Sequence, residues 1–332
     1  MVESPVCLYN ARMLKTKLTE QLKLEHPVVS APMAIAAGGE LASAVSRAGG
    51  LGLIGGGYGV EAWIMEQFAI AHPMPVGCGL ITWALKKNPE LLVRVIDQKP
   101  AAMFLSFGNP ASFAPAIKDA GITLICQVQT VADAQQALDC GADVIVAQGA
   151  EAGGHGEKRG TVTLVPEIAD VIANLHSQAT LCAAGGIADG RGLAAALMLG
   201  ADGVLIGSRF WASSEAVVHP NMHARALAAS GDMTIRSSVM DIARQLNWPP
   251  RYTARVLRNQ FTDQWHENIA ELMLVAEREA EQWAAAWQEG NMDIANTFVG
   301  EAAGLINSIE PAEDILLSIV GEAEALLNRQ WD

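Results

Sequence analysis

Short apolar segments alternate with segments of helical length from residue 27 to residue 208. Each apolar segment is brief and uniformly hydrophobic, as is typical of strands buried on both faces of a parallel sheet. The predicted strands are Pro27–Met33, Leu51–Gly57, Pro75–Ile81, Ala101–Phe107, Thr123–Val128, Asp143–Gly149, Thr180–Gly186 and Gly203–Ser208, and the predicted helices are Gly39–Ala48, Glu61–Ala71, Pro89–Gln98, Ser112–Ala120, Val131–Cys140, Pro166–His176 and Asp189–Leu199. This strict alternation predicts an α/β fold, a (β/α)8 TIM barrel, in preference to an open doubly wound sheet.

The alternation stops after Ser208. Residues 210–300 contain no convincing strand and are rich in helix-forming residues, as in Arg255–Phe261 and Glu267–Trp287. The chain is then expected to return through Glu301–Ser308 to a terminal helix at Pro311–Arg329. We therefore expect residues 1–209 and 301–332 to form the barrel, and 210–300 to form a helical insertion or lid that contributes to the substrate pocket.

Composition and charge exclude several classes of protein. Hydrophobic residues make up 51% of the 332 residues and charged residues 17%, which indicates a globular protein with a large core. The net charge of −14 disfavours nucleic acid and anionic membranes as partners, because both require a basic surface. We expect a small-molecule substrate, and the number of subunits stays open, with a homodimer as one candidate.

The sequence shows no secretory or membrane-spanning signal. Residues 1–10 lack a basic region followed by an apolar one, and no run of eighteen apolar residues occurs. The odd number of widely spaced cysteines favours buried free thiols over disulfides. We therefore expect a soluble, cytoplasmic protein. The cysteines are Cys7, Cys78, Cys126, Cys140 and Cys182.

The strongest local signal for ligand binding lies at the ends of the last two predicted strands. Gly185 and Gly186 follow the seventh strand, and Gly207 and Ser208 follow the eighth. Glycines let backbone N–H groups approach an anion closely, and this corner of a TIM barrel commonly binds phosphate. Asp189 is placed to cap the next helix, whose amino end carries partial positive charge. These residues predict a phosphate site.

A second signal is the segment 148–156, which follows the sixth strand and places four glycines around His155. Such a loop runs close to a ligand, and an imidazole titrates near neutral pH. His155 could therefore remove a proton from a carbon acid or donate one to a developing negative charge. We predict that His155 is catalytic.

Weaker signals come from two other strand ends and from a pair of histidines beyond the last strand. Pro32 fixes the backbone after the first strand, and Met33 can lie flat against a ring system. Gln127 is a polar residue in an apolar strand and requires a partner, which a flavin edge or another ligand group would provide. His219 and His223 are four residues apart in a polar stretch, where a solvated surface is favoured over a zinc site. No nucleotide-triphosphate loop occurs, and no metal is expected.

Taken together, these motifs resemble the nitronate monooxygenases, formerly called 2-nitropropane dioxygenases. Their order and spacing agree from Pro27 to Phe210, and Ala302–Ile306 with the helix at Pro311 resembles the C-terminal closure of the family. The motifs are Ala31-Pro32-Met33, Gln148-Gly149-x-x-Ala152-Gly153-Gly154-His155, the run from Ala184 to Gly192, and Gly207-Ser208-Arg209-Phe210.

The resemblance implies a non-covalently bound FMN and assigns a role to each motif. Ala31, Pro32 and Met33 would lie beside the isoalloxazine ring, Gln148 and Gly153 would contact the flavin, and Gly186 with the turn Leu205, Ile206, Gly207 and Ser208 would hold its phosphate. His155 falls on the catalytic histidine of the family. The implied reaction is the oxidation of a nitronate: the nitronate gives one electron to FMN, dioxygen combines with the radicals, and a carbonyl compound and nitrite result. For neutral nitroalkanes the histidine would remove the α-proton.

Two other functions stay open. A related FMN enzyme that uses NAD(P)H, either an enoyl-acyl-carrier-protein reductase or a quinone reductase, shares the barrel and the Gly-Gly-His loop. A flavin-binding or scaffold protein without turnover is the alternative of another class, and it would not depend on His155.

Overall fold

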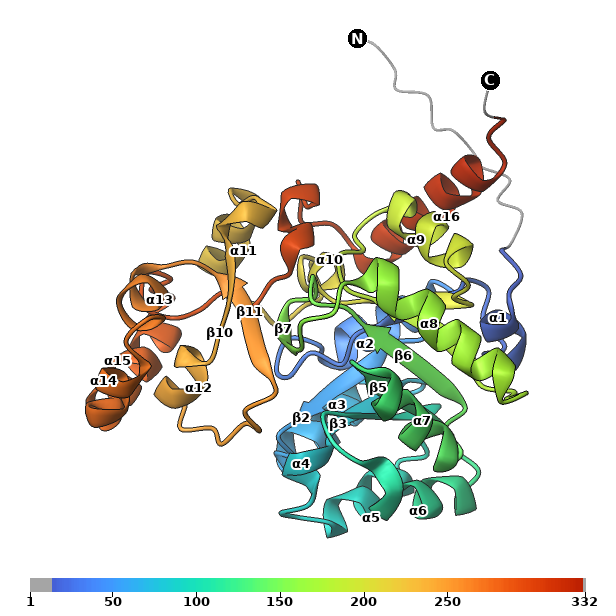
Figure 1. The fold of residues 1–332 in the computed structure, drawn as a ribbon, viewed down its shortest axis with the longest axis horizontal. Coiled ribbons are helices and arrows are strands. Elements are labelled where there is room, and N and C mark those ends of the chain that lie inside the picture. The colour runs from blue at the N-terminus through green and yellow to red at the C-terminus, as the bar shows by residue number, and fades with distance from the viewer. Residues whose placement is uncertain (1–13, 331–332) are drawn as a thin grey trace.

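Eight parallel strands form a nearly closed barrel in the computed structural model, which describes residues 14–330 (Figure 1). The strand order is β1-β9-β8-β6-β5-β4-β3-β2, and a parallel bridge between Val29 and Leu51 joins β1 to the residues that precede β2. The predicted (β/α)8 barrel is therefore confirmed. Its strands are β1 Val28–Ser30, β2 Leu53–Gly57, β3 Gly77–Ile81, β4 Ala102–Ser106, β5 Thr123–Val128, β6 Val144–Gln148, β8 Thr180–Ala184 and β9 Gly203–Ile206.

The strands are buried on both faces because successive side chains point alternately into the barrel and outward. Phe104 and Val146 belong to the cluster that fills the barrel, and Leu18 of the first helix packs with them. Their neighbours Met103 and Ile145 belong to the larger cluster between the strands and the outer helices. The uniformly apolar segments of the sequence follow from this double burial.

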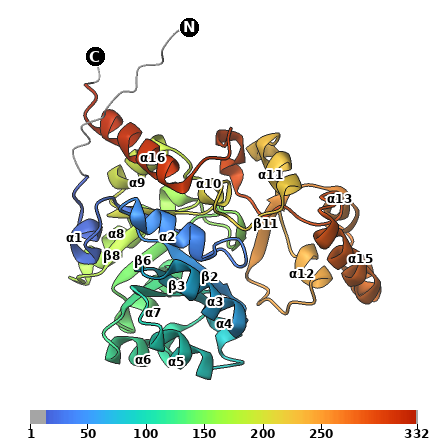
Figure 2. The ribbon, with the colours of Figure 1, turned by 180° about the vertical axis from the view of Figure 1, so that it is seen from behind.

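Helices alternate with the strands around the barrel, and α16 packs against α9 and α2 (Figure 2). Left-handed glycines such as Gly141 and Gly200 follow α7 and α9, as the Cys-Gly and Leu-Gly pairs predict. The α-helices of the barrel are α1 Lys17–Leu22, α2 Gly39–Arg47, α3 Glu61–Ala71, α4 Thr82–Leu85, α5 Glu90–Asp97, α6 Ala114–Asp119, α7 Val131–Asp139, α8 Thr161–Asn174, α9 Gly190–Met198, α10 Ser208–Trp211 and α16 Ala312–Leu327, with short 3-10 helices at η1 Pro110–Ser112 and η3 Glu301–Leu305.

One helix begins earlier than the sequence analysis predicts. The predicted start was Pro166, but α8 begins at Thr161 and contains Pro166 in its interior. The Glu151 carboxylate provides the reason, because it accepts hydrogen bonds from Thr161 N at 3.0 Å and from Thr161 Oγ1 at 2.8 Å. A side chain from another loop therefore caps the helix, which a local pattern does not reveal.

The insertion, residues 210–300, contains strands as well as helices, so the prediction that it lacks strands was wrong. Strands β10 and β11 pair antiparallel, and β11 also pairs with β7 of the glycine-rich loop after β6. Short polar strands of this kind depend on long-range pairing and carry a weak local signal. Strand β7 spans Gly154–Gly156. The elements of the insertion are α11 Pro220–Leu227, η2 Gly231–Met233, β10 Thr234–Ser237, α12 Val239–Ala243, β11 Thr253–Leu257, α13 Gln260–Trp265, α14 Ile269–Leu274 and α15 Ala276–Glu289.

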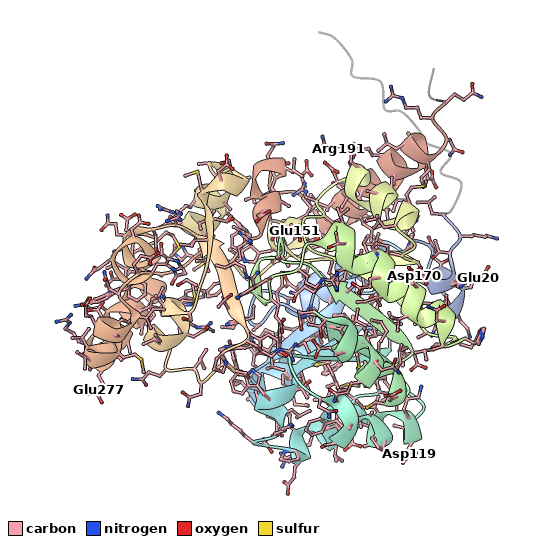
Figure 3. The ribbon with its side chains drawn as sticks, viewed as in Figure 1. Glu20, Asp119, Glu151, Asp170, Arg191 and Glu277 are labelled. Atoms are coloured by element: carbon pink, nitrogen blue, oxygen red, sulfur yellow. The ribbon has the colours of Figure 1, made fainter. Side chains whose placement is uncertain are left out.

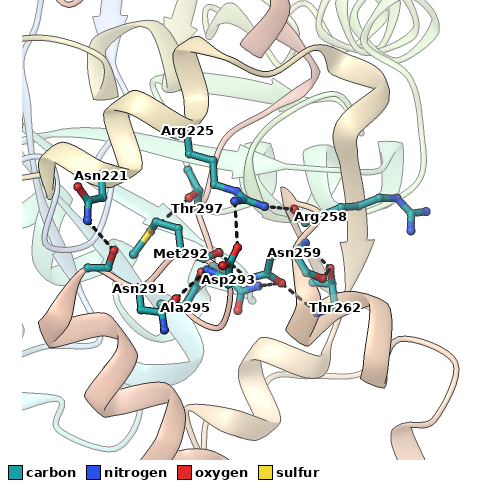
Figure 4. A network of polar contacts seen from close by, with 12 residues as sticks. Asn221, Arg225, Arg258, Asn259, Thr262, Asn291, Met292, Asp293, Ala295 and Thr297 are labelled. Carbon is teal, nitrogen blue, oxygen red and sulfur yellow. Dashed lines mark hydrogen bonds and ion pairs between the residues drawn. The ribbon is translucent and has the colours of Figure 1, made fainter.

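A network of polar contacts, with Asn259 buried at its centre, holds the insertion together (Figure 4). Asn259 caps α13, and its amide nitrogen donates to the carbonyl oxygens of Met292 and Ala295 at 3.1 and 3.0 Å. On the neighbouring helix α11, Asn221 donates to the Gly290 carbonyl at 2.8 Å. The segment that follows α15 is thereby fixed to two helices, and it leads the chain back towards the barrel.

The expectations about cysteines, membrane-spanning helices and metal ligands can be compared with the described residues. Cys78, Cys126 and Cys182 are buried free thiols and Cys140 is half-buried, whereas Cys7 and residues 1–10 lie outside the described part of the chain. Between residues 14 and 330, no helix is long and apolar enough to cross a membrane. The same residues contain no group of three histidine, cysteine, aspartate or glutamate side chains that could hold a metal ion.

Candidate active site

A cavity of about 790 Å³ lies at the carboxyl ends of the barrel strands and is bounded on its other side by the insertion. A volume of this size falls within the range of cofactor and substrate sites. Most of the predicted site residues line it, namely Ala31, Pro32, Met33, Gln127, Gln148, Gly153, His155, Gly185, Gly186, Leu205, Gly207 and Ser208. The fold therefore brings together motifs from the ends of five barrel strands, β1, β5, β6, β8 and β9.

Ile206 is the one predicted site residue whose side chain does not reach the cavity. It is 1% exposed and packs in the cluster beneath the outer helices, whereas its neighbour Leu205 belongs to the cluster inside the barrel. Adjacent residues of a strand point to opposite faces, so the two side chains cannot both point inward. Any contact between Ile206 and a phosphate would therefore come from its backbone, and the predicted role of the turn Leu205–Ser208 stays a prediction.

The two glycine turns predicted to hold a phosphate lie side by side, because β8 and β9 are neighbouring parallel strands. Gly185 and Gly186 adopt positive φ angles of 105° and 75°, which favour glycine. In the part of the chain that the structure describes, the N–H groups of Gly186 and Gly207 donate to no acceptor. Two free amides on one cavity wall, without Cβ atoms in front of them, form a suitable cradle for an anion.

The amino end of α9 does not add free donors to this cradle. Asp189 caps the helix as predicted, accepting from Arg191 N at 3.0 Å and Gly192 N at 3.2 Å. Gly190 N donates to the Glu322 carboxylate at 2.8 Å. Figure 3 shows Arg191 at the outer edge of the barrel and Glu151 near the junction of barrel and insertion. The turns of Gly186 and Gly207 are therefore better placed than α9 to bind an anion.

The glycine-rich loop after β6 is held against the end of the insertion. A Cβ atom on Gly153 would lie 2.6 Å from Gly300 N, a distance that real Cβ atoms do not show. Gly300 N in turn donates to Ser208 Oγ at 2.9 Å. Only glycine at position 153 allows the two backbones to approach in this way.

Two arginines of the small sheet also fix this loop. Arg236 Nη1 and Arg255 Nε both donate to the carbonyl oxygen of Ala150, at 3.1 and 2.9 Å. Burial and the neighbouring charge of Arg255 lower the pKa of Arg236 to about 10, so it stays protonated at neutral pH. The loop therefore has a defined position over the cavity.

Gln148 lies at the centre of an amide network at the end of β6. Its Oε1 accepts from Gln127 at 3.1 Å and from Gln129 at 2.8 Å, and its Nε2 donates to the carbonyl of His155 at 3.0 Å. The partner that Gln127 requires is therefore Gln148. Because both ends of the Gln148 amide are engaged, its orientation towards the cavity is fixed.

His155 stands on β7 and forms a buried pair with a carboxylate from the insertion. Its Nε2 lies 2.9 and 3.0 Å from the two carboxylate oxygens of Asp241, and the side chains are 7% and 5% exposed. The imidazole also stacks on Trp248, with ring centres 3.4 Å apart and an angle of 7° between the planes. Both the position and the plane of the imidazole are thus determined by the insertion.

The electrostatics of this pair favour a neutral imidazole. Burial lowers the pKa of His155, while the hydrogen bond and charge of Asp241 act in the opposite direction without cancelling it. Nε2 therefore carries the proton that is donated to Asp241, and Nδ1 keeps its lone pair. Nδ1 has no hydrogen-bond partner among the described residues, so it is free to accept a proton from a ligand.

Sequence reasoning missed Asp241 and Trp248. Asp241 is 86 residues from His155 in sequence, and nothing in that distance predicts their contact. The one available signal was a single carboxylate in the otherwise apolar run Val239–Ala243. A lone charge in an apolar helix requires a buried partner, but the sequence does not identify which partner.

The prediction of a solvated surface for His219 and His223 was also wrong. His219 lines the cavity and caps α11 by accepting from Asn221 N at 3.1 Å. His223 is half-buried, and its Nε2 lies 3.0 Å from the carbonyl oxygen of Trp211. Each ring is engaged in local structure, and the pair does not form a metal site.

A TIM barrel with two free glycine amides and a buried histidine–carboxylate pair at its carboxyl end has the arrangement of an α/β-barrel enzyme. The family model of the nitronate monooxygenases matches residues 15–69 and 88–322. This chain belongs to the nitronate monooxygenase family. The predicted resemblance is therefore confirmed.

Individual relatives agree with this assignment. The chain is 35% identical to nitronate monooxygenase npaC of Metarhizium robertsii, over 90% of this chain and 91% of the relative. It is 32% identical to a nitronate monooxygenase of Neurospora crassa, over 91% and 90% of the two chains. The structure of FabK from Thermotoga maritima superposes with a TM-score of 0.83 at 32% identity and covers 95% of this chain and 97% of that one. Proteins of these two groups are generally flavin-dependent.

Proposed function

We propose that this protein binds FMN and uses dioxygen to oxidise alkyl nitronates, and nitroalkanes after removal of a proton, to a carbonyl compound and nitrite. The observation that carries the proposal is the position of His155, which Asp241 and Trp248 hold in the same cavity as the free amides of Gly186 and Gly207. Removal of a proton from the carbon next to a nitro group requires a base of this kind.

The cavity fits a flavin mononucleotide in its chemistry. The free amides of Gly186 and Gly207 would hold the phosphate, and the apolar segment Ala31–Met33 with the fixed amide of Gln148 would receive the ring. Cβ atoms at Gly153 or Gly185 would meet backbone atoms at 3.0 Å or closer, so the glycines are needed for the loop shape. When bound, FMN supplies the acceptor for one electron from the nitronate.

The protein's own residues supply orientation and proton transfer. His155 would accept the α-proton of a nitroalkane at Nδ1, and the Asp241 carboxylate would stabilise the imidazolium that forms. Trp248 keeps the imidazole in one plane. Phe107 and Tyr252 contact Trp248 edge-on and support its position. A preformed nitronate has already lost its proton, so it requires His155 less.

The direct test is a steady-state assay with ethylnitronate and nitroethane. We expect dioxygen consumption, with nitrite and acetaldehyde formed in equal amounts, and a much larger loss of the nitroethane rate than of the ethylnitronate rate in the His155→Ala variant. Absence of nitrite with either substrate would contradict the proposal.

A second candidate is an NAD(P)H-dependent FMN reductase, which the similarity to FabK favours. FabK proteins are enoyl-acyl-carrier-protein reductases. Two assays discriminate these functions. A reductase would produce no nitrite from ethylnitronate or nitroethane, and it would consume NADH with an enoyl thioester or a quinone.

A further inference from the structure

Arg244 is an unpaired cation in the wall of the cavity. It follows helix α12 directly and, among the described residues, is the only arginine or lysine that lines the cavity. It forms no ion pair with a carboxylate in residues 14–330. Other arginines with limited exposure do pair with carboxylates; Arg209 pairs with Glu310, and Arg255 pairs with Glu301 at 2.8 Å.

Aromatic rings hold the guanidinium in place of a carboxylate. Its carbon atom lies 5.5 Å from the ring centre of Tyr58, 5.3 Å from that of Phe298 and 5.8 Å from that of Trp283. All three rings line the cavity. Their faces attract the cation but do not neutralise its charge, so the group keeps its capacity to bind an anion.

Arg244 is linked to the proposed catalytic base, His155, through contacts with Tyr58 and Trp248. The hydroxyl of Tyr58 accepts a hydrogen bond from Trp248 Nε1 at 3.1 Å, and Trp248 stacks on His155. Helix α12 carries Asp241, and Arg244 follows it one turn later, so one short segment supplies both the partner of His155 and the cation. The guanidinium therefore belongs to the same wall of the cavity as the acid–base pair.

The chemistry of arginine indicates which ligand would be bound. A guanidinium presents a planar fork of N–H donors that matches an anion with two oxygens in one plane. A carboxylate has this shape, and so does a nitronate, whose charge is shared by the two oxygens of its nitro group. Arg236 and Arg255 cannot serve, because their donors are already engaged by Ala150 and Thr253 or Thr234.

We propose that Arg244 is the anion-recognition residue of this cavity and binds a planar two-oxygen anion of the substrate, while the surrounding aromatic rings receive the apolar part. The anion is either the nitronate group itself or a carboxylate elsewhere on the same molecule. The inference deepens the proposed function, since it specifies the substrate as an anion with an apolar body.

A binding measurement without turnover tests the site independently of the reaction. The purified protein is titrated with butyrate and with butyramide, which has the same size and no charge, and binding is followed by tryptophan fluorescence. We expect binding of butyrate in preference to butyramide, a loss of affinity of about 10- to 100-fold for butyrate in Arg244→Met, and partial recovery in Arg244→Lys. Arg258→Met removes an exposed charge from the same insertion and should bind as the unaltered protein does.

Steady-state assays then identify the anion that is bound. The nitronates of 1-nitropentane and 4-nitrobutyrate differ in that only the second carries a carboxylate. In Arg244→Met, an equal rise in KM for both substrates indicates contact with the nitronate group, and a rise for 4-nitrobutyrate alone indicates contact with the carboxylate. Butyrate affinity unchanged in a correctly folded Arg244→Met protein, shown by an unaltered circular dichroism spectrum, overturns the proposal. If butyrate binding depends on Arg244 but no nitronate is oxidised, the anion site stands and the proposed function fails.

Discussion

Replacing Asp241 with asparagine tests the role of the carboxylate beside His155. Asparagine has nearly the same shape and can still accept a hydrogen bond, but it carries no charge to stabilise an imidazolium. The two contacts at 2.9 and 3.0 Å join groups that are almost completely buried, so solvent screens them weakly. A hydrogen bond to a charged group contributes about 1.5–3 kcal/mol. We therefore expect kcat/KM for nitroethane to fall roughly 10- to 100-fold.

The same substitution should have a much smaller effect on ethylnitronate, because this substrate has no proton to give. It should also change the pH profile of kcat/KM for nitroethane. Activity is lost as pH falls through the pKa of His155, and Asp241 raises that pKa. Removing the carboxylate lowers the pKa further, so the acidic limb of the profile should move to lower pH.

A matched control is Asp263→Asn, which removes an exposed carboxylate from the same insertion and should leave both substrates unaffected. Equal losses for nitroethane and ethylnitronate in Asp241→Asn, or a pH profile that does not move, would refute the assigned role. Either result would mean that Asp241 supports the structure of the insertion and not proton transfer.

Three further substitutions test the geometry of the site and its surroundings, and a fourth, in α16, serves as a control. Gly153→Ala should destabilise the protein by about 1–3 kcal/mol and reduce its flavin content, because the new Cβ would lie 2.6 Å from Gly300 N. Gly321→Ala places its Cβ with no atom within 4 Å and should stabilise α16 by about 0.5–1 kcal/mol. Thermal unfolding measures both changes in stability. Asp189→Ala should cost about 0.5–2 kcal/mol of stability through loss of the α9 cap, as measured by denaturant unfolding. Trp248→Leu should lower the nitroethane rate about 2- to 10-fold by releasing the His155 ring, and an unchanged rate would show that the stack is not needed.

The barrel and the adjacency of its two glycine turns could be predicted because their signals are local. Strands such as β5 are short, apolar segments between glycine-terminated helices, and the turns of Gly186 and Gly207 follow consecutive strands that must be neighbours. The alternation of a strand also explains why the side chains of Leu205 and Ile206 lie on opposite faces of β9.

The second half of the site could not be predicted because it depends on how the insertion packs on the barrel. His155 acquires its partner only when β7 pairs with β11, which places α12 and Asp241 beside it. Antiparallel pairing across about a hundred residues leaves no periodic pattern in the sequence. A contact that forms through tertiary packing alone is visible only in the structure.

The central claim is that the cavity binds a flavin and that a nitronate, not NADH, reduces it. Anaerobic rapid mixing of the purified yellow protein, first with ethylnitronate and separately with NADH, measures this through the visible absorbance of the flavin. We predict a rapid fall in absorbance with ethylnitronate and no change with NADH. Rapid bleaching by NADH alone, or purified protein without any flavin absorbance, would contradict the account.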